Sequence, residues 1–246
     1  LFVDKDFQGF FSKIKNANIF RISGPHPSGN VSVQIQKTNP INFGDKVWVI
    51  RPEDIVNIAI LFSTGIYSCK RTLAISGSSV SNPQYFNTNI GSNLSSILKK
   101  LNIDPSMQNR YINGDVFSGI EVQKDGHIDF FNNLVSVIPE GNKHRFFGWV
   151  PFFYNKIPSL SRTSFSWLFG RKGYNVDTNL NGEERALVVT GEMEKVFPMD
   201  IYPMQLIKAC MAGDIEKMEG LGIYEVIPED FGLIDYSNTS KIEAQE

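Results

Sequence analysis

The chain has 246 residues, with 24 Lys and Arg against 26 Asp and Glu, which gives a formal net charge of −2. Apolar residues make up 41 % and charged residues 20 %, a composition that forms a packed core and excludes a disordered chain. The charge balance excludes a nucleic-acid binder that works through a basic face. The longest apolar stretch, residues 146–154, falls far short of the roughly 20 residues of a transmembrane helix. No signal peptide is visible, and we expect an internal piece of a longer protein, cut at both ends.

The only two cysteines, Cys69 and Cys210, are far apart in the sequence. Zinc fingers, redox dithiols and iron–sulfur clusters need Cys or His residues at close spacing, so no metal site is predicted for this chain. We expect two buried, reduced thiols rather than a disulfide, which favours a cytosolic compartment.

The first 69 residues mix helix, strand and loop. Residues 4–15 have apolar side chains at helical spacing, and residues 18–22 are strand-like. A loop with two prolines and two glycines follows at residues 24–29. Residues 52–64 predict a helix, because Pro52 suits its first position, Glu53 and Asp54 favour the positive end of its dipole, and Gly65 suits its cap. This helix is apolar nearly all round, which predicts that it is buried.

Residues 70–122 predict a small β-grasp domain. Strand-like segments at residues 72–75 and 84–90 come before a helix, and segments at 110–113 and 116–122 follow it. The helix carries an apolar stripe at i, i+3, i+4 and i+7 that should pack on the sheet, formed by Leu94, Ile97, Leu98 and Leu101.

The rest of the chain divides into a mixed β region, residues 123–199, and a helical region, residues 200–246. Strands are predicted at residues 134–138, 145–153 and 186–189. Asp200 can cap a helix that runs to Met211, and Asp214 can cap a shorter one that ends at Gly220. Ser240 and Glu243 form a capping box for a further helix.

The familiar catalytic signatures are missing, including the glycine-rich nucleotide loops, HExxH and GxSxG. Three histidines, His26, His127 and His144, are isolated from one another in the sequence. His26 lies in the proline-rich loop and could contact a ligand, although local packing explains it more simply. His127 is most simply an exposed hairpin residue. We therefore assign no catalytic residue and no metal ligand, and cofactor-binding residues stay unknown.

Two aromatic segments have alternative interpretations. Residues 146–154 could stack on a quinone or flavin ring, but a core strand is the simpler interpretation. Residues 159–174 combine Trp167 and phenylalanines with Arg162, Arg171 and Lys172. This segment could dock on a neighbouring subunit or on membrane headgroups, or it could be a solvated helix face.

Helix starts and core packing account for the remaining candidates. The acidic residues of the C-terminal region lie near expected helix starts, where the helix dipole explains them. The methionines there are predicted to fill the core rather than to bind a soft metal: Met193, Met199, Met204, Met211 and Met218.

Several strings in family order resemble the family of A subunits of the bacterial sodium-translocating NADH:quinone oxidoreductases (Na⁺-NQR). They include Ser23-Gly-Pro-His-Pro-Ser-Gly29, Val47-Trp-Val-Ile-Arg-Pro-Glu-Asp-Ile-Val56, Arg71-Thr-Leu-Ala-Ile-Ser-Gly77, Val196-Phe-Pro-Met-Asp200 and Leu221-Gly-Ile-Tyr-Glu225. No one string is diagnostic, but their ordered sum is specific and covers about residues 18–243.

The resemblance implies a fold and a role. Residues 1–69 would be the C-terminal part of a Rossmann-like α/β domain, and residues 70–122 a soluble-ligand-binding β-grasp (SLBB), in an α+β chain. Members of this family are expected to bind no redox cofactor and to lie on the cytoplasmic side of the inner membrane, next to the membrane-embedded B subunit. The chain would contribute to quinone binding, with NADH and quinone as substrates of the whole complex. Relatives often carry cysteine in the loop corresponding to residues 234–240, and this chain has none, so we expect no metal or redox role there.

Two other functions remain as alternatives. One is a flavin- and NADH-binding subunit of complex I or Rnf type, which the missing nucleotide loop and cysteine cluster disfavour. The other is a free ligand-binding β-grasp module, which the long flanking regions disfavour.

Overall fold

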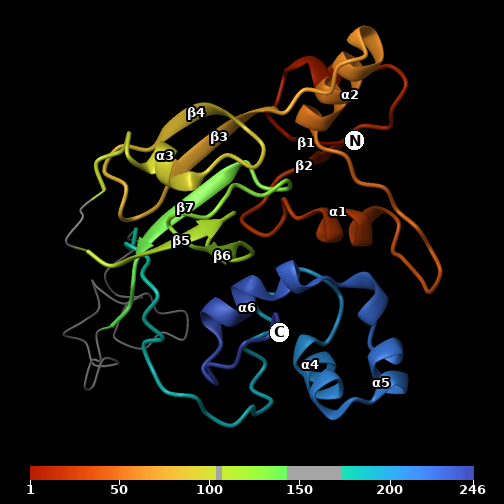
Figure 1. The fold of residues 1–246 in the computed structure, drawn as a ribbon. Helices are drawn as coiled ribbons and strands as arrows, with labels where there is room; N and C mark the ends of the chain where they lie inside the picture. The colour runs from red at the N-terminus through yellow and green to blue at the C-terminus, as the bar shows by residue number, and fades with distance from the viewer. Residues whose placement is uncertain (104–106, 143–172) are drawn as a thin grey trace. The chain divides into compact units, whose positions relative to one another are not determined.

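The computed structural model describes residues 1–103, 107–142 and 173–246 (Figure 1). The chain divides into two compact units: unit 1 combines residues 1–49 with residues 185–246, and unit 2 holds residues 50–184. The described residues form a mixed α/β fold with a mixed sheet and several helices, which confirms the fold class at that level. The four domain limits expected from the sequence stay predictions.

Unit 2 is built on a five-stranded sheet in the order β4-β3-β7-β5-β6. Its strands are β3 (Lys70–Ser76), β4 (Gln84–Asn89), β5 (Asn109–Asn113), β6 (Ile120–Val122) and β7 (Leu134–Pro139). β3 and β7 are parallel neighbours in the middle of the sheet, and every other pair is antiparallel. The central strand β7 thus comes from the segment that follows the predicted β-grasp.

Helix α3 (Leu94–Leu98) covers the core face of this sheet. Asn93 caps it, because its side-chain oxygen accepts from Ser95 N at 3.1 Å. The predicted stripe is confirmed: Leu94, Ile97, Leu98 and Leu101 are buried and belong to one core cluster with side chains of the central strands, namely Leu73, Ile75, Val135 and Val137.

Helix α2 (Pro52–Thr64) has the predicted bounds, with Pro52 at its first position and Gly65 at φ 71° as its cap. Its predicted burial is wrong within the described structure, where α2 has no buried residue. Ile55 is 40 % exposed and Phe62 is 86 % exposed. The apolar sequence of α2 therefore did not predict the burial of its side chains.

Unit 1 holds a short parallel pair of strands, β1 (Phe2–Asp4) and β2 (Phe20–Ile22), in which Val3 lies opposite Arg21. Between them lies the 3-10 turn η1 (Phe10–Lys13), not the helix predicted for residues 4–15. Phe10 is 77 % exposed, so the helical spacing of the phenylalanines there does not reflect a packed face.

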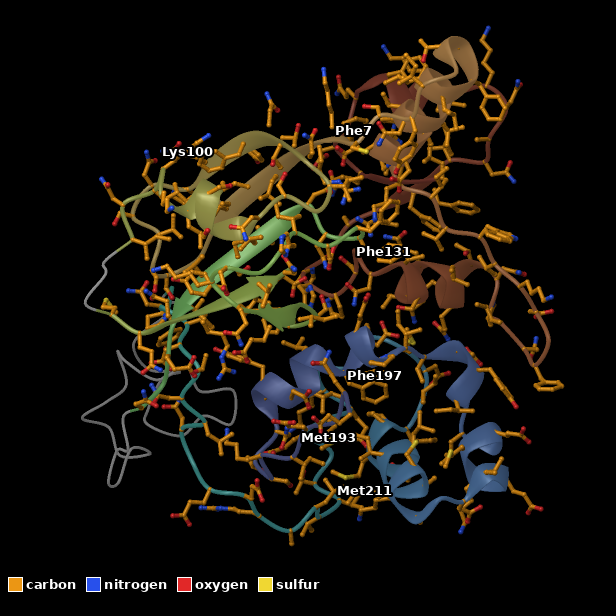
Figure 2. The ribbon with its side chains drawn as sticks, viewed as in Figure 1. Phe7, Lys100, Phe131, Met193, Phe197 and Met211 are labelled. Atoms are coloured by element: carbon orange, nitrogen blue, oxygen red, sulfur yellow. The ribbon has the colours of Figure 1, made fainter. Side chains whose placement is uncertain are left out.

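The helices of unit 1 come from both of its segments. They are α1 (Val31–Thr38), α4 (Pro203–Ala212), α5 (Ile215–Gly220) and α6 (Gly232–Ser237), with the 3-10 turns η4 (Ile223–Glu225) and η5 (Pro228–Phe231). Val33 of α1 belongs to the same core cluster as Met193, Phe197 and Met204 (labelled in part in Figure 2). Residues that are far apart in the sequence therefore share one core.

Some C-terminal expectations are confirmed and others are wrong. Asp214 caps α5, since its carboxylate accepts from Lys217 N at 3.2 Å. α4 has Tyr202, not Asp200, as its N-cap. Neither the helix at Ser240 nor the strand at residues 186–189 forms; the Ser240 hydroxyl instead donates to Ala186 O at 3.2 Å. Among the methionines, Met193, Met199 and Met204 are core, whereas Met211 is 71 % exposed.

Candidate functional site

The residues that the sequence singled out do not form one site. Cys69 and Cys210 are both free and exposed, so their predicted burial is wrong. His26 is exposed in its loop, and its bond to Pro27 is cis. His127 is exposed, as predicted, and its carbonyl oxygen accepts from Asn113 Nδ2 at 3.1 Å. His144 and the aromatic segments 146–154 and 159–172 lie outside the described residues.

The most distinctive polar group of unit 2 is the guanidinium of Arg71. It lies on β3 and is only 3 % exposed. Its Nη1 donates to the carbonyl oxygen of Phe130, and also to that of Asn132 at 3.4 Å. Its Nε has no hydrogen-bond partner, and the Glu53 carboxylate lies 3.8 Å away. A buried guanidinium is costly unless it is paired, and the carboxylate beside it compensates its charge.

Glu53, in the first turn of α2, joins three groups of the sheet. Its Oε2 accepts from Asn133 Nδ2 at 2.6 Å and faces Arg71 Nε. Its Oε1 accepts from Thr72 N at 3.4 Å. We call Glu53, Arg71, Thr72 and Asn133, together with the carbonyls of Phe130 and Asn132, the Arg71 cluster.

The loop before β7 is held rigidly against this cluster. Asp129 Oδ1 accepts from Phe131 N and Asn132 N, each at 2.7 Å, which fixes a tight turn. The Arg71 guanidinium lies 5.6 Å from the centre of the Phe130 ring, and that of Arg51 lies 5.8 Å from the centre of the Phe131 ring. These distances suit cation–π attraction. Arg51, just before α2, therefore holds the Phe131 ring, and Arg71 of β3 holds the Phe130 ring.

An open pocket of about 510 Å³ adjoins the cluster. Its lining is polar and consists of Glu53, Lys70, Arg71, Thr72, Asn87, Thr88 and Asn89. Small-molecule sites are usually lined mostly by apolar and aromatic side chains. This pocket therefore differs from the aromatic surface expected of a quinone site.

The chemistry available here is recognition and positioning. The cluster contains a carboxylate, a guanidinium, an amide and a hydroxyl, and it pairs no nucleophile with a general base. Across the described ranges, no three His, Cys, Asp or Glu residues converge as metal ligands would. In the same ranges, no helix combines the length and apolar character needed to cross a bilayer.

Sequence reasoning missed this cluster, although one signal was present. Arg71, Leu73 and Ile75 alternate along one strand, and all three are buried. A cation in the inward register of a core strand must have a partner. That partner, Glu53, comes from a helix whose acidic first turn was already explained by the dipole.

Two family models match the chain. The model described as "NqrA second alpha/beta domain" matches residues 2–67, and the model described as "NQRA C-terminal domain" matches residues 72–124. Curated relatives match across both. The A subunit of the Na(+)-translocating NADH-quinone reductase of Haemophilus influenzae (strain ATCC 51907) is 35 % identical over 233 residues, which are 94 % of this chain and 51 % of the relative. Its counterpart in Pasteurella multocida is 35 % identical over 226 residues, which cover 91 % of this chain and 49 % of the relative.

The chain belongs to the NqrA family. This confirms the resemblance drawn from the ordered strings. The chain spans about half the length of the curated NqrA relatives it matches. Helix α2 lies in the second α/β domain match and most of β3 in the C-terminal domain match, so the Arg71 cluster lies where the two NqrA segments meet.

Proposed function

We propose that this chain is part of an NqrA protein that works in a sodium-translocating NADH:quinone reductase without a redox centre of its own. Its role is to contribute to quinone binding and to the assembly of the complex, next to the membrane-embedded B subunit on the cytoplasmic side of the inner membrane. The single observation that carries the proposal is the similarity to relatives of that name over 94 % of the chain.

The fold assignments belong to the same proposal. The sheet of unit 2 has its first and last strands, β3 and β7, parallel at the centre, with β4 antiparallel outside β3, β5 antiparallel outside β7, and helix α3 on one face. This order supports a β-grasp, with β7 as its last strand. The parallel pairing of β1 and β2 supports a Rossmann-like α/β origin for the first segment, because parallel strands need a crossover connection.

Copurification with the rest of the complex tests the assignment. The chain, within its intact NqrA protein and carrying an affinity tag, is produced with the remaining subunits in membranes. After detergent extraction, the eluate should contain the other subunits and should reduce quinone with NADH in a sodium-dependent manner. Recovery of the tagged protein alone, with the activity left in the flow-through, contradicts the proposal.

The partner contact is proposed for residues 159–174, which include Trp167 and Arg171. The double variant Trp167→Ala with Arg171→Ala should stay folded and capture the other subunits at least about tenfold less well, because aromatic and arginine side chains dominate interface energies. The pair Tyr85→Ala with Lys100→Ala serves as control, since it removes one aromatic ring and one cation from described, exposed positions elsewhere. Equal capture by both double variants places the contact in another segment.

The flavin-binding alternative makes a different prediction. This chain has two cysteines, fewer than an iron–sulfur cluster needs, and it has no glycine-rich nucleotide motif. The purified chain should therefore be colourless. Visible absorbance from stoichiometric flavin, or iron by elemental analysis, would favour the complex I or Rnf alternative.

A further inference from the structure

The Arg71 cluster joins a helix inside one family match to a sheet whose first strand, β3, lies mostly inside the other. Glu53 belongs to α2, inside the match to the second α/β domain. The groups it contacts belong to β3 and to the residue that precedes β7: Thr72 N at 3.4 Å, Arg71 Nε at 3.8 Å and Asn133 Nδ2 at 2.6 Å. One carboxylate therefore ties α2 to the two central strands of the sheet.

The two partners of the ion pair differ in burial and in how they are held. Arg71 is 3 % exposed and fixed by two carbonyl oxygens of the loop before β7. The Glu53 side chain is 26 % exposed and reaches the guanidinium from the helix. Removing one partner of a buried ion pair leaves the other charge without compensation. Arg71 is therefore anchored in unit 2 with or without α2, while its compensating charge depends on where α2 lies.

A second contact fixes the direction of the same helix. Arg51, immediately before Pro52, lies over the Phe131 ring at 5.8 Å. Within α2, the partly buried residues are Glu53, Asp54, Asn57 and Ile60, which lie toward one side of the helix. The opposite side exposes Ile58 and Phe62, at 44 % and 86 %. Apolar burial therefore contributes little to holding α2 on the sheet, and polar contacts at its first turn must do it.

We propose that the Arg71 cluster is a polar latch that holds helix α2, a helix of the second α/β domain segment, on the sheet of the C-terminal domain segment. The latch consists of Glu53 on the helix and of Arg71, Thr72 and Asn133 on the sheet, with Arg51 and Phe131 as its second hold. When the latch is broken, α2 is released and its exchange with solvent rises, while the sheet and its α3 core stay folded.

Hydrogen exchange measured by mass spectrometry on the full chain tests the latch. Glu53→Gln removes the charge that faces Arg71 and keeps the side-chain length. Peptides covering residues 52–64 should then exchange at least about tenfold faster than in the wild type, whereas peptides of β3 and β7 should stay within about twofold. Asp54→Asn is the matched control, because it removes a charge from the same turn at a residue that is not a partner of Arg71, Thr72 or Asn133. It should leave α2 within about twofold of the wild type.

A second variant keeps the ion pair intact and guards against simple unfolding. Asn133→Ala removes the 2.6 Å hydrogen bond to Glu53 without leaving a charge unpaired, and it should speed exchange in α2 about threefold without affecting β3. The proposal is wrong if Glu53→Gln leaves α2 unchanged. It is also wrong if both Glu53→Gln and Asn133→Ala accelerate the sheet as much as the helix, since the cluster would then be core rather than a latch.

Discussion

At the scale of single residues, Asp235 of α6 has a carboxyl whose protonation is linked to folding. Burial is the main cause that raises its pKa to about 6, and the charges of Glu243 and Glu246 add to it, against the hydrogen bonds from the backbone of Ala244 and Gln245. A carboxyl with a raised folded pKa contributes stability that is complete below its unfolded pKa, near 3.8, and is lost as the pH rises through 6.

Asp235→Asn should therefore stabilise unit 1 at pH 7.5 by about 1 kcal/mol, an amount already reduced for the partial exposure of the group. The amide oxygen can still accept from Ala244 N, which lies 2.5 Å from Oδ1 in the wild type. Urea unfolding at pH 5 and pH 7.5 measures the effect, and the gain should shrink toward the lower pH. An equal gain at both pH values would show that the substitution acts through packing and not through the charge.

Gly77, in the turn after β3, occupies a position where a side chain cannot fit. Its φ is +121°, and an added Cβ would lie 2.2 Å from Val137 O of the central strand β7. Gly77→Ala should cost about 3 kcal/mol, because the backbone conformation is strained and the strand would have to move.

Gly91→Ala is the matched control for Gly77, because Gly91 also has a positive φ, +74°, but opens to free space. It should cost only the strain, about 1 kcal/mol. Thermal unfolding of both variants separates the two effects. Similar losses of stability at the two positions would mean that β7 moves away from the added Cβ at little cost.

At the scale of elements, the sequence predicted the limits of those helices whose ends carry a chemical signal. α2 and α5 have the predicted limits because Pro52, Gly65 and Asp214 act locally. Residues 4–15 and the Ser240–Glu243 box failed because local spacing is only a preference, and packing overrides it. Ser240, for instance, is buried against Ala186 and cannot act as a free cap.

The candidate site was harder to foresee than the fold. Arg71 and Glu53 are 18 positions apart, and Asn133 is 80 positions from Glu53. No local pattern pairs them; only the register of β3 beside β7 brings them together. The strand alternation of Arg71 could have indicated a buried cation, but not its partner.

Helix α3 offers the sharpest test at this scale. Leu98 is 4 % exposed and packs within the core cluster of the sheet. Leu98→Ala should cost about 2–5 kcal/mol, because it leaves a cavity between the helix and the sheet. Its neighbour Lys99 is exposed, so Lys99→Ala controls for changes in helix propensity and should stay within about 0.5 kcal/mol. A loss below that limit for Leu98→Ala would mean that this face is not core.

At the scale of the whole molecule, the chain leaves unit 1 after residue 49 and returns to it at residue 185. The two segments are joined by a buried contact in which Ser32 Oγ, at the start of α1, donates to Asp230 Oδ1. Asp230 is 1 % exposed, and its Oδ2 also accepts from Ile227 N at 3.0 Å. One carboxylate thus contacts both η5 and α1. It joins the two segments of unit 1, which residues 50–184 separate in the sequence.

Asp230→Ala should therefore loosen both segments of unit 1 together. Alanine has no acceptor, so both the Ser32 hydroxyl and Ile227 N lose their partner in a buried place, at a cost of about 1–3 kcal/mol each. Hydrogen exchange should become faster in peptides covering residues 31–38 and 223–237, while peptides of β3, β5 and β7 keep their protection because their core cluster contains no residue of unit 1. Glu229→Ala is the control, since Asn30 contacts the backbone carbonyl of Glu229 and not its carboxylate. Faster exchange confined to residues 223–237 would show that α1 is held by its apolar contacts alone, and faster exchange in the sheet as well would show that the two units unfold as one.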